Sequence, residues 1–515
     1  MADPRHRAPR PFVGVRLGAR EPVPVPEAHP TRLPTPLPSY RGRLSWQATP
    51  NGKPPPCPST PTPSPPWGAL LGPRLSTAES ERATHGASEA YLRAPPPEAV
   101  AFPETTAEVA AILRLCNGRG IPVIGFGTGT SLEGHTLAIR GGLTLSLARM
   151  ARVLEVRAGD MLAVVQPGLT REALNEELRA TGLFFPVDPG ANASLGGMAS
   201  TRASGTTAVR YGTMRDNVLG LEAVLADGRV IRTGSRAAKS AAGYDLTGLM
   251  VGAEGTLGII TELTLRLHGQ PEEVAAGVCA FPTLEAAVTC VAATMQSGIP
   301  MARIEFVDCD AARAFNRSAG AAMPELPHLM VEFHGSPAAV VADAAGFGAL
   351  AAEFGGLGFD WATTPEARAR LWRMRHGAYR ACLALRPGAT AVVTDVCVPM
   401  SELPAAVSAA AADIAAEGLV GPMVGHVGDG NFHAQLLVEP GNEAEIAAAK
   451  RVATRMAERA IAAGGTITGE HGVGLGKRPL MAAQHGAGWQ VMGAIKAALD
   501  PRGILNPGKL VPDPD

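Results

Sequence analysis

The chain has 515 residues, of which 46% are hydrophobic and 18% are charged, so most of it can bury an ordinary globular core. The 46 basic and 47 acidic side chains leave a formal net charge of −1, which argues against a nucleic acid or an anionic membrane recognised through bulk charge. The seven cysteines contain no CxxC pair, which argues against a disulfide framework, a zinc ribbon or an iron–sulfur cluster and fits a reducing compartment. Because no apolar run reaches the ~18–20 residues that cross a bilayer, the sequence predicts a soluble protein.

The first 74 residues differ in composition from the rest of the chain. They contain ten Lys and Arg against three Asp and Glu, and they hold 20 of the 45 prolines. Proline at this density removes backbone donors and blocks the interiors of helices and sheets. We therefore expect residues 1–74 to form a disordered extension. Its Arg-rich start has some character of a transit peptide, but the prolines spoil an amphipathic helix, so an over-long gene start is an equal alternative.

The ordered chain is expected to begin near Leu75, and the first clear helix follows a capping box. Thr105 and Glu108 have the spacing of that box, and apolar residues at helical spacing lead on to Cys116. Residues 121–124 read as a short buried strand that runs into a glycine loop. Further strands are predicted at 143–147, 153–156 and 162–165, a helix at 171–180, and a hairpin at 222–231 around Asp227-Gly228.

Beyond residue 270, Ala-rich segments alternate with apolar strand patterns. Helices are predicted near 285–297, 403–417 and 443–463, and the pattern weakens at 268–274, around Pro271. This mixture of strands and helices predicts an α+β chain with at least two domains, divided near residue 270.

The glycine loop contains Gly125, Gly127 and Gly129, directly after a predicted strand. Such a loop can turn backbone NH groups toward an anion, although a tight turn without a ligand explains it equally well. The spacing is not GxGxxG, because position 130 is Thr, so a Rossmann motif is excluded. A second glycine-rich run at 472–477 is not a phosphate-binding P-loop, because Arg478 stands where Ser or Thr is needed.

A longer glycine-rich region is more specific. In the segments 186–190, 194–200, 203–206, 210–213 and 252–260, small residues alternate with hydroxyl side chains, so the backbone can approach a large planar polar ligand. Through these motifs the stretch 95–267 resembles the FAD-binding domain of the vanillyl-alcohol oxidase type, also called PCMH-type. The whole of 75–512 resembles the FAD-linked D-lactate dehydrogenases, whose relatives act on glycolate or D-2-hydroxyglutarate.

The resemblance implies an FAD-binding domain at 75–270, an α+β substrate (cap) domain at 271–480, and a C-terminal segment at 481–515 that returns to the flavin domain. It assigns a large set of residues to the flavin, its ribityl chain and its pyrophosphate: Gly125, Gly127, Thr128, Gly129, Thr130, Ser131, Pro186, Gly190, Ser194, Gly197, Met198, Ser200, Thr201, Ser204, Gly205, Tyr211, Glu254, Gly255, Gly258, Ile260 and Asn506. Several relatives attach FAD covalently through a His or Cys in the first loop. Hydroxyl residues occupy that place here, so we expect non-covalent FAD, with nearby His135 as the alternative attachment point.

Two short glycine-flanked segments suggest a metal site. Residues 425–433 place His426 and His433 seven apart, and residues 468–474 add Glu470 beside His471. Two histidines and a carboxylate are a typical ligand set, although ordinary hydrogen-bonded side chains are the alternative. The resemblance assigns His426, His433 and Glu470 to a divalent metal, Zn or Mn.

A metal suits the oxidation of a 2-hydroxy acid, because chelation through the hydroxyl and one carboxylate oxygen makes the hydroxyl more acidic. His471 would then take the hydroxyl proton while a hydride moves to the flavin. The family pattern favours Arg375 over Arg373 for the substrate carboxylate, although a solvent-facing helical Arg is an equal alternative. Relatives that act on a dicarboxylic acid carry a lysine near the segment 392–399, which has none here, so a short monocarboxylic substrate is expected.

These observations predict an FAD-dependent dehydrogenase that oxidises D-lactate to pyruvate and passes electrons to a cytochrome or a quinone. A glycolate oxidase flavin subunit is the second enzyme hypothesis, and a flavin- or metal-binding protein without turnover is the third. We expect a cytoplasmic protein, or one peripheral to the inner membrane, and a mitochondrial one in a eukaryote. The resemblance leaves a homodimer open.

Overall fold

The structure is a computed structural model that describes residues 71–237 and 239–512. The disorder expected for residues 1–70 lies outside the described residues. Residues 71–74 are described and are not disordered: Leu71 is buried in the core beside Ile112, and Gly72–Arg74 forms a short 3-10 helix. The boundary expected at residue 75 was therefore placed too late, because the apolar side chain of Leu71 already belongs to the core.

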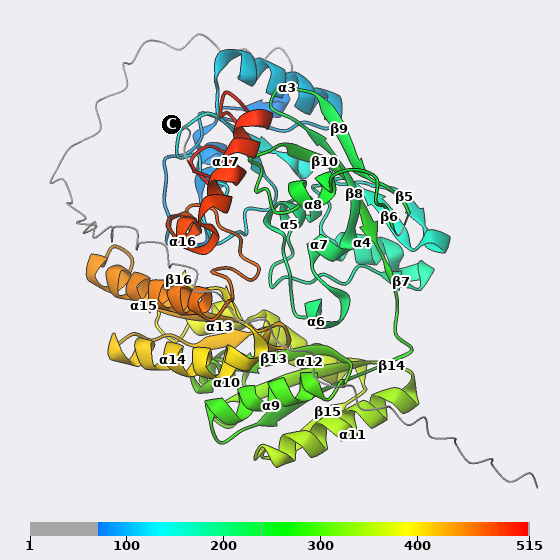
Figure 1. Cartoon of the computed structure of the whole chain (residues 1–515), viewed down its shortest axis with the longest axis vertical. Helices are drawn as coiled ribbons and strands as arrows, with labels where there is room; N and C mark the ends of the chain where they lie inside the picture. Colours follow the sequence, from blue (N-terminus) through cyan, green and yellow to red (C-terminus); the bar gives the residue numbers. More distant parts are fainter. Residues whose placement is uncertain (1–70, 238, 513–515) are drawn as a thin grey trace, which may run out of the picture. The chain divides into compact units, whose positions relative to one another are not determined.

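The N-terminal half contains two main sheets (Figure 1). The first has the order β1 (Leu75–Ser76), β2 (Ala99–Ala101), β4 (Leu143–Ser146) and β3 (Val123–Phe126), and it is parallel except for β1. The second is antiparallel, with the order β5 (Val153–Arg157), β6 (Leu162–Val165), β10 (Ile259–Arg266), β8 (Val218–Val224) and β9 (Val230–Gly234). A short pair joins β7 (Leu183–Phe184) to β11 (His268–Gly269).

The helices of this half are short. They are α2 (Glu79–Gly86), α3 (Thr106–Arg119), α4 (Arg171–Leu178), α5 (Leu195–Thr201), α6 (Ala208–Tyr211), α7 (Met214–Asn217) and α8 (Leu246–Met250). The predicted cap of α3 is half right. Thr105 Oγ1 accepts from the backbone N of Glu108 at 3.2 Å, but the Glu108 carboxylate accepts from Glu104 N at 2.7 Å and pairs with Arg74. The cationic partner from another segment draws Glu108 away from the reciprocal bond of a capping box.

Two other local predictions were close to the structure. The expected hairpin is formed by β8 and β9, in which Val224 pairs with Val230. The expected strand 121–124 instead begins at Val123 and continues to Phe126, because parallel pairing with β4 continues as far as Phe126 and Ser146. The first glycine of the loop, Gly125, therefore lies within the strand.

The C-terminal half is built on an eight-stranded sheet. Its strands follow the order β15 (Phe359–Ala362), β12 (Glu273–Ala280), β14 (His328–Gly335), β13 (Met301–Val307), β18 (Met423–Gly425), β19 (Asn431–Val438) and β16 (Thr390–Val393), and β17 (Val396–Cys397) also pairs with β19. The helices are α9 (Leu284–Gln296), α10 (Cys309–Ala319), α11 (Pro337–Glu353), α12 (Pro365–His376), α13 (Ala378–Leu383), α14 (Leu403–Ala416) and α15 (Glu443–Ala462).

Alternation along β13 sends its side chains to two different surroundings. Ile304 and Phe306 belong to the core formed with α9, α11, α14 and α15, whereas Val307 belongs to the core formed with α10, α12 and α13. Because successive residues of a strand point to opposite faces, Arg303 and Glu305 lie on the same face as Val307. This face also carries the site described below.

The last residues of the chain contact the N-terminal half (Figure 1). Helices α16 (Met481–His485) and α17 (Ala487–Leu499) are followed by an isolated bridge between Leu505 and Val123. Lys496 Nζ donates to the carbonyl of Thr256 at 2.7 Å. The C-terminal segment thus helps to hold strand β3, which leads into the glycine loop.

Candidate active site

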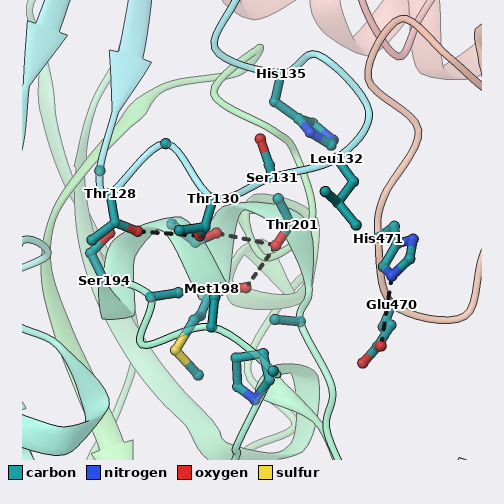
Figure 2. A pocket seen from close by; sticks show the side chains of 18 of the residues that line it. Thr128, Thr130, Ser131, Leu132, His135, Ser194, Met198, Thr201, Glu470 and His471 are labelled. Carbon is teal, nitrogen blue, oxygen red and sulfur yellow. Dashed lines mark hydrogen bonds and ion pairs between the residues drawn. The ribbon is translucent and has the colours of Figure 1, made fainter. Parts of the chain in front are cut away.

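A cavity of about 710 Å³ is lined by segments from both halves of the chain. Figure 2 shows Thr128, Thr130 and Ser131 on one side of it, and Glu470 and His471 across from them. The two sides differ in chemistry. We call the side formed by the glycine loop and the segment 189–201 the flavin end, and the side formed by residues 426, 433, 470 and 471 the metal end.

The flavin end is made of small residues whose hydrogen-bonding groups face the cavity. A Cβ at Gly127 would lie 2.1 Å from Ser194 Oγ, so glycine lets the loop cross the start of α5 with the Ser194 hydroxyl in its present position. The buried hydroxyls of Ser131 and Ser194 have no hydrogen-bond partner among the described residues. Buried polar atoms in native proteins are usually paired, so these two hydroxyls suit a polar ligand that passes between the loop and the helix. The flavin end therefore fits the pyrophosphate and ribityl parts of FAD.

Most of the predicted flavin contacts line this cavity. They are Gly125, Gly127, Thr128, Gly129, Thr130, Ser131, Gly190, Ser194, Gly197, Met198, Ser200, Thr201, Glu254, Gly255, Gly258, Ile260 and Asn506.

Four predicted flavin contacts do not line it, and their contact with FAD stays a prediction: Pro186, Ser204, Gly205 and Tyr211. The Pro186 carbonyl accepts from Thr207 Oγ1 at 2.6 Å, and a Cβ at Gly205 would lie 2.5 Å from the backbone of Asp188. The Tyr211 hydroxyl lies 2.7 Å from His334 Nδ1. Ser204 is buried in the same run. Pro186 and Gly205 pack beside the buried Asp188 carboxylate, whose donors are Thr206, Thr207 and Arg303.

His135, the alternative point of covalent attachment, lies in the wall of the cavity. Its Nε2 is 3.3 Å from the Glu254 carboxylate, which also accepts from the backbone N of Val473 and Gly474. A Cβ at Gly472 would lie 2.8 Å from both His135 Nε2 and Glu254 Oε1. The pair thus packs closely against the loop that follows His471.

At the metal end, three predicted ligands lie together. His426 follows β18, His433 lies in β19, and β18 and β19 pair so that Val424 is opposite His433. The Glu470 Oε1 atom is 3.1 Å from His426 Nε2 and 3.3 Å from His433 Nε2. The donor atoms of the three residues all lie within 4.8 Å of one another.

Hydrogen bonds on the far side of each ring prepare both histidines as ligands. His426 Nδ1 lies 2.8 Å from Glu305 Oε1, and His433 Nδ1 lies 3.2 Å from the Thr394 carbonyl. Each bond holds a proton on Nδ1, so Nε2, on the side of Glu470, is the nitrogen that would bind a metal. Buried His433 Nε2 and Glu470 Oε2 have no hydrogen-bond partner among the described residues. The donor set therefore fits a divalent cation.

One carboxylate oxygen of Asp395 and one ring nitrogen each of His433 and His471 also lie within 4.8 Å of one another. Its oxygens, however, already accept from Asn431 Nδ2 at 2.7 Å, from Thr468 Oγ1 at 2.6 Å and from Lys477 Nζ at 3.1 Å. The backbone N of Glu470 and of His471 also donates to it, at 3.0 and 2.9 Å. With its lone pairs engaged, Asp395 acts as the anchor of the 468–471 turn and is a poor candidate for a metal ligand.

His471, the predicted base, is stacked on His433 with 4.8 Å between ring centres. Burial lowers the pKa of His471 to about 4, so its ring is neutral at neutral pH and can accept a proton. The Nδ1 atom is buried without a partner among the described residues, and Nε2 lies 3.8 Å from Glu470 Oε1.

The two arginines considered for the substrate carboxylate differ in burial. Arg375, on α12, is 7% exposed, lines the cavity and lies 2.5 Å from Glu305, whereas Arg373 is exposed. The Nε atom of Arg375 has no hydrogen-bond partner among the described residues. The position of Arg375 therefore favours it over Arg373.

The sequence prediction missed the charged residues behind the site: Glu305, Asp395, Lys477 and Glu133. A usable signal was present for Glu305, because Arg303 and Glu305 interrupt an otherwise apolar strand. A charge in such a strand is either exposed or paired. Nothing in the sequence identifies which partner it takes.

A cradle of glycines and hydroxyls facing two histidines, a carboxylate and a buried arginine defines the chain as an FAD-dependent oxidoreductase. Residues 97–234 match the FAD binding domain, and residues 270–510 match the C-terminal domain of FAD linked oxidases. The chain therefore belongs to the FAD-linked oxidase family, in the group that includes the D-lactate dehydrogenases.

Curated relatives support this membership. A probable mitochondrial D-lactate dehydrogenase of Danio rerio is 47% identical over 441 residues, which cover 85% of this chain and 89% of the relative. The D-lactate dehydrogenase [cytochrome], mitochondrial, of Arabidopsis thaliana is 44% identical over 446 residues, covering 86% and 79%. The glycolate oxidase subunit GlcD of Bacillus subtilis is 36% identical over 420 residues, covering 80% and 89%.

Among solved structures, p-cresol methylhydroxylase with substrate bound superposes with a TM-score of 0.71 at 19% identity, covering 86% of this chain and 95% of that one. The fold is thus the predicted α+β arrangement with a PCMH-type FAD-binding domain.

None of the helices in residues 71–237 and 239–512 is long and apolar enough to cross a membrane.

Proposed function

We propose that this protein oxidises D-lactate to pyruvate, using non-covalent FAD and a divalent metal, Zn or Mn, held by His426, His433 and Glu470. The observation that carries the choice of substrate is the wall beside the metal end. Val393 and Val424 line the cavity there, and Val393 pairs with Gln435 on the strand that carries His433. These two valines suit the methyl group of lactate and offer no hydrogen bond or charge to a second carboxylate.

Bound FAD supplies the hydride acceptor, and a bound divalent metal supplies a Lewis acid that makes the substrate hydroxyl more acidic. The remaining work falls to side chains of this chain. Arg375 binds the substrate carboxylate through its guanidinium group, and this contact fixes the C2 hydrogen in one direction. His471 accepts the hydroxyl proton at Nε2, which lies beside Glu470, while Asp395 keeps the turn that carries His471 in place.

The electron acceptor is proposed from the relatives. The Arabidopsis relative is named for a cytochrome acceptor, and we propose a cytochrome here, with a quinone as the alternative. Both D-lactate dehydrogenase relatives are named as mitochondrial, so in a eukaryotic cell we propose the mitochondrion, and otherwise the cytoplasm or the periphery of the inner membrane. A homodimer stays a prediction.

Anaerobic reduction of the bound flavin tests the substrate directly. D-lactate, L-lactate, glycolate and D-2-hydroxyglutarate are mixed separately with the yellow protein, and bleaching near 450 nm (roughly the flavin band) is followed in time. We expect D-lactate to be fastest. Faster bleaching by glycolate would favour a glycolate oxidase flavin subunit, faster bleaching by D-2-hydroxyglutarate would contradict the apolar-wall argument, and no bleaching by any of them would point to a binding protein without turnover.

A further inference from the structure

One buried carboxylate contacts both a proposed metal ligand and the arginine proposed to bind the substrate carboxylate. Glu305 lies in β13 with 0% of its surface exposed. Its oxygens lie 2.8 and 2.9 Å from His426 Nδ1, and Oε2 lies 2.5 Å from an Arg375 guanidinium nitrogen. Glu305 itself does not line the cavity, so it can affect the substrate only through these two partners.

The two contacts have different consequences. A proton held on His426 Nδ1 leaves Nε2 free on the side of Glu470, which is the form a metal needs. The ion pair with Arg375 fixes one guanidinium nitrogen, so the remaining edge of the planar fork has a defined direction. A buried carboxylate requires partners of this kind, since an isolated charge in the protein interior is strongly unfavourable.

We propose that Glu305 is a positioning residue that sets the ligand form of His426 and the direction of Arg375 with a single carboxylate. The site for the metal and the site for the substrate carboxylate then depend on the same side chain. This inference rests on the proposed function, because it concerns how that metal and that carboxylate are held.

The substitution Glu305→Gln keeps the size of the side chain but removes its charge. Its amide oxygen can still accept from His426 only if the amide NH₂ faces Arg375, which is itself a donor. We therefore expect the Kd for Mn²⁺ to rise by about 10–100-fold, the usual cost of losing a partner behind a metal ligand. The KM for D-lactate should rise in the same variant by about tenfold, as expected when a charge-assisted contact is misaligned.

A matched control lies on the neighbouring strand. Glu332, in β14, is also buried and pairs with Arg303 at 3.3 Å and with His334 at 2.7 Å, and it does not line the cavity. Glu332→Gln should also lower thermal stability, because it removes one of the two carboxylates that pair with buried Arg303. Its Kd for Mn²⁺ should stay within about twofold of the wild type, since its partners are not metal ligands.

The test measures Mn²⁺ binding by electron paramagnetic resonance on FAD-loaded wild type, Glu305→Gln and Glu332→Gln, followed by KM for D-lactate. A rise in both Kd and KM in Glu305→Gln alone supports the proposal. Unchanged Kd and KM in that variant overturns it while leaving the metal site intact. A wild type that binds neither Mn²⁺ nor Zn²⁺ overturns the metal site of the proposed function and the positioning role with it.

Glu305→Asp keeps the proposal testable if Glu305→Gln gives no folded protein. The shorter side chain retains the charge but cannot reach both His426 and Arg375 in the observed arrangement. At least one of Kd and KM should therefore rise, and wild-type values for both would overturn the proposal.

Discussion

The two ends of the cavity bind by different means. The flavin end offers backbone and hydroxyl groups on glycine-rich turns. Its small side chains let a ligand come close to these groups. The metal end offers charged side chains, and each is held by a buried partner from another strand or loop. The difference shows that the first end depends on local backbone shape, whereas the second depends on a network of charges assembled across the fold.

Electrostatics at the metal end depend on pairing. Burial raises the pKa of Glu470, but His426 and His433 outweigh that effect and hold it well below its usual value. Burial likewise lowers the pKa of His426, and the carboxylates of Glu305 and Glu470 raise it well above 6.5. Each group is therefore charged only because its neighbours are present, so removal of one member should disturb the others.

The largest expected effect comes from emptying the metal end alone. A chelator should lower turnover by about 10³-fold or more, since a Lewis acid contributes several kcal/mol to such a reaction. His433→Ala should have the same effect, while FAD stays bound because its contacts are at the other end. Metal analysis, flavin absorbance and turnover check this, and added Mn²⁺ should restore the chelated wild type. Full turnover without metal would contradict the proposed site.

The next effect should appear when the base is removed and the ligands are kept. His471→Ala should slow flavin reduction by D-lactate by about 10²–10⁴-fold, the range for loss of a general base. Metal and FAD content should be unchanged, because neither group depends on this side chain in the proposed arrangement. Single-turnover absorbance measures the rate of flavin reduction, and metal analysis measures the metal content of the variant. Loss of the metal in this variant would instead make His471 a ligand.

A substitution at the flavin end should weaken FAD binding and leave metal binding unchanged. Gly127→Ala would place a methyl group against the Ser194 hydroxyl, which must then turn away from its present position. Loss of that hydroxyl as a partner of the ligand costs about 0.5–1.5 kcal/mol, so FAD affinity should fall by up to about tenfold. Mn²⁺ affinity should not change. Gly159→Ala is the matched control, because a Cβ there meets nothing within 4 Å. Equal FAD affinity in the two variants would show that the loop tolerates a side chain.

Arg375→Lys should raise KM for D-lactate by about tenfold, because lysine keeps the charge but loses the planar fork. Arg373→Lys should have almost no effect, because Arg373 is exposed. Steady-state kinetics on both variants, with thermal unfolding to exclude a loss of fold, decides between them. The opposite result would move the role to Arg373.

The smallest effect is expected at Tyr211, which the sequence pattern placed against the flavin but which does not line the cavity. Tyr211→Phe removes a hydroxyl bonded to His334, so unfolding free energy should fall by about 1 kcal/mol. FAD content and KM should be unchanged. Denaturant unfolding and flavin absorbance measure both, and a clear loss of FAD would restore Tyr211 as a cofactor contact.

Features that depend on residues close together in the chain could be predicted from the sequence. The hairpin around Asp227 and Gly228 is confirmed, because short-range spacing limits backbone shape. The glycine loop lines the cavity and the two histidine segments come together, while their roles with FAD and a metal stay predictions. The sequence also led to the family through these motifs. The pattern of small residues did not distinguish Gly197, which lines the cavity, from Gly205, which packs against Asp188.

The partners that hold the metal end could be identified only in the folded chain. Glu305 is 121 residues from His426 in the chain and hydrogen-bonded to it in space, and Asp395 is 76 residues from His471. The preference for Arg375 over Arg373 also rests on the tertiary structure, because Arg373 is exposed and Arg375 is buried beside Glu305. A buried charge is stable only beside its partner, and which residue becomes that partner depends on the pairing of distant strands, which local spacing does not specify.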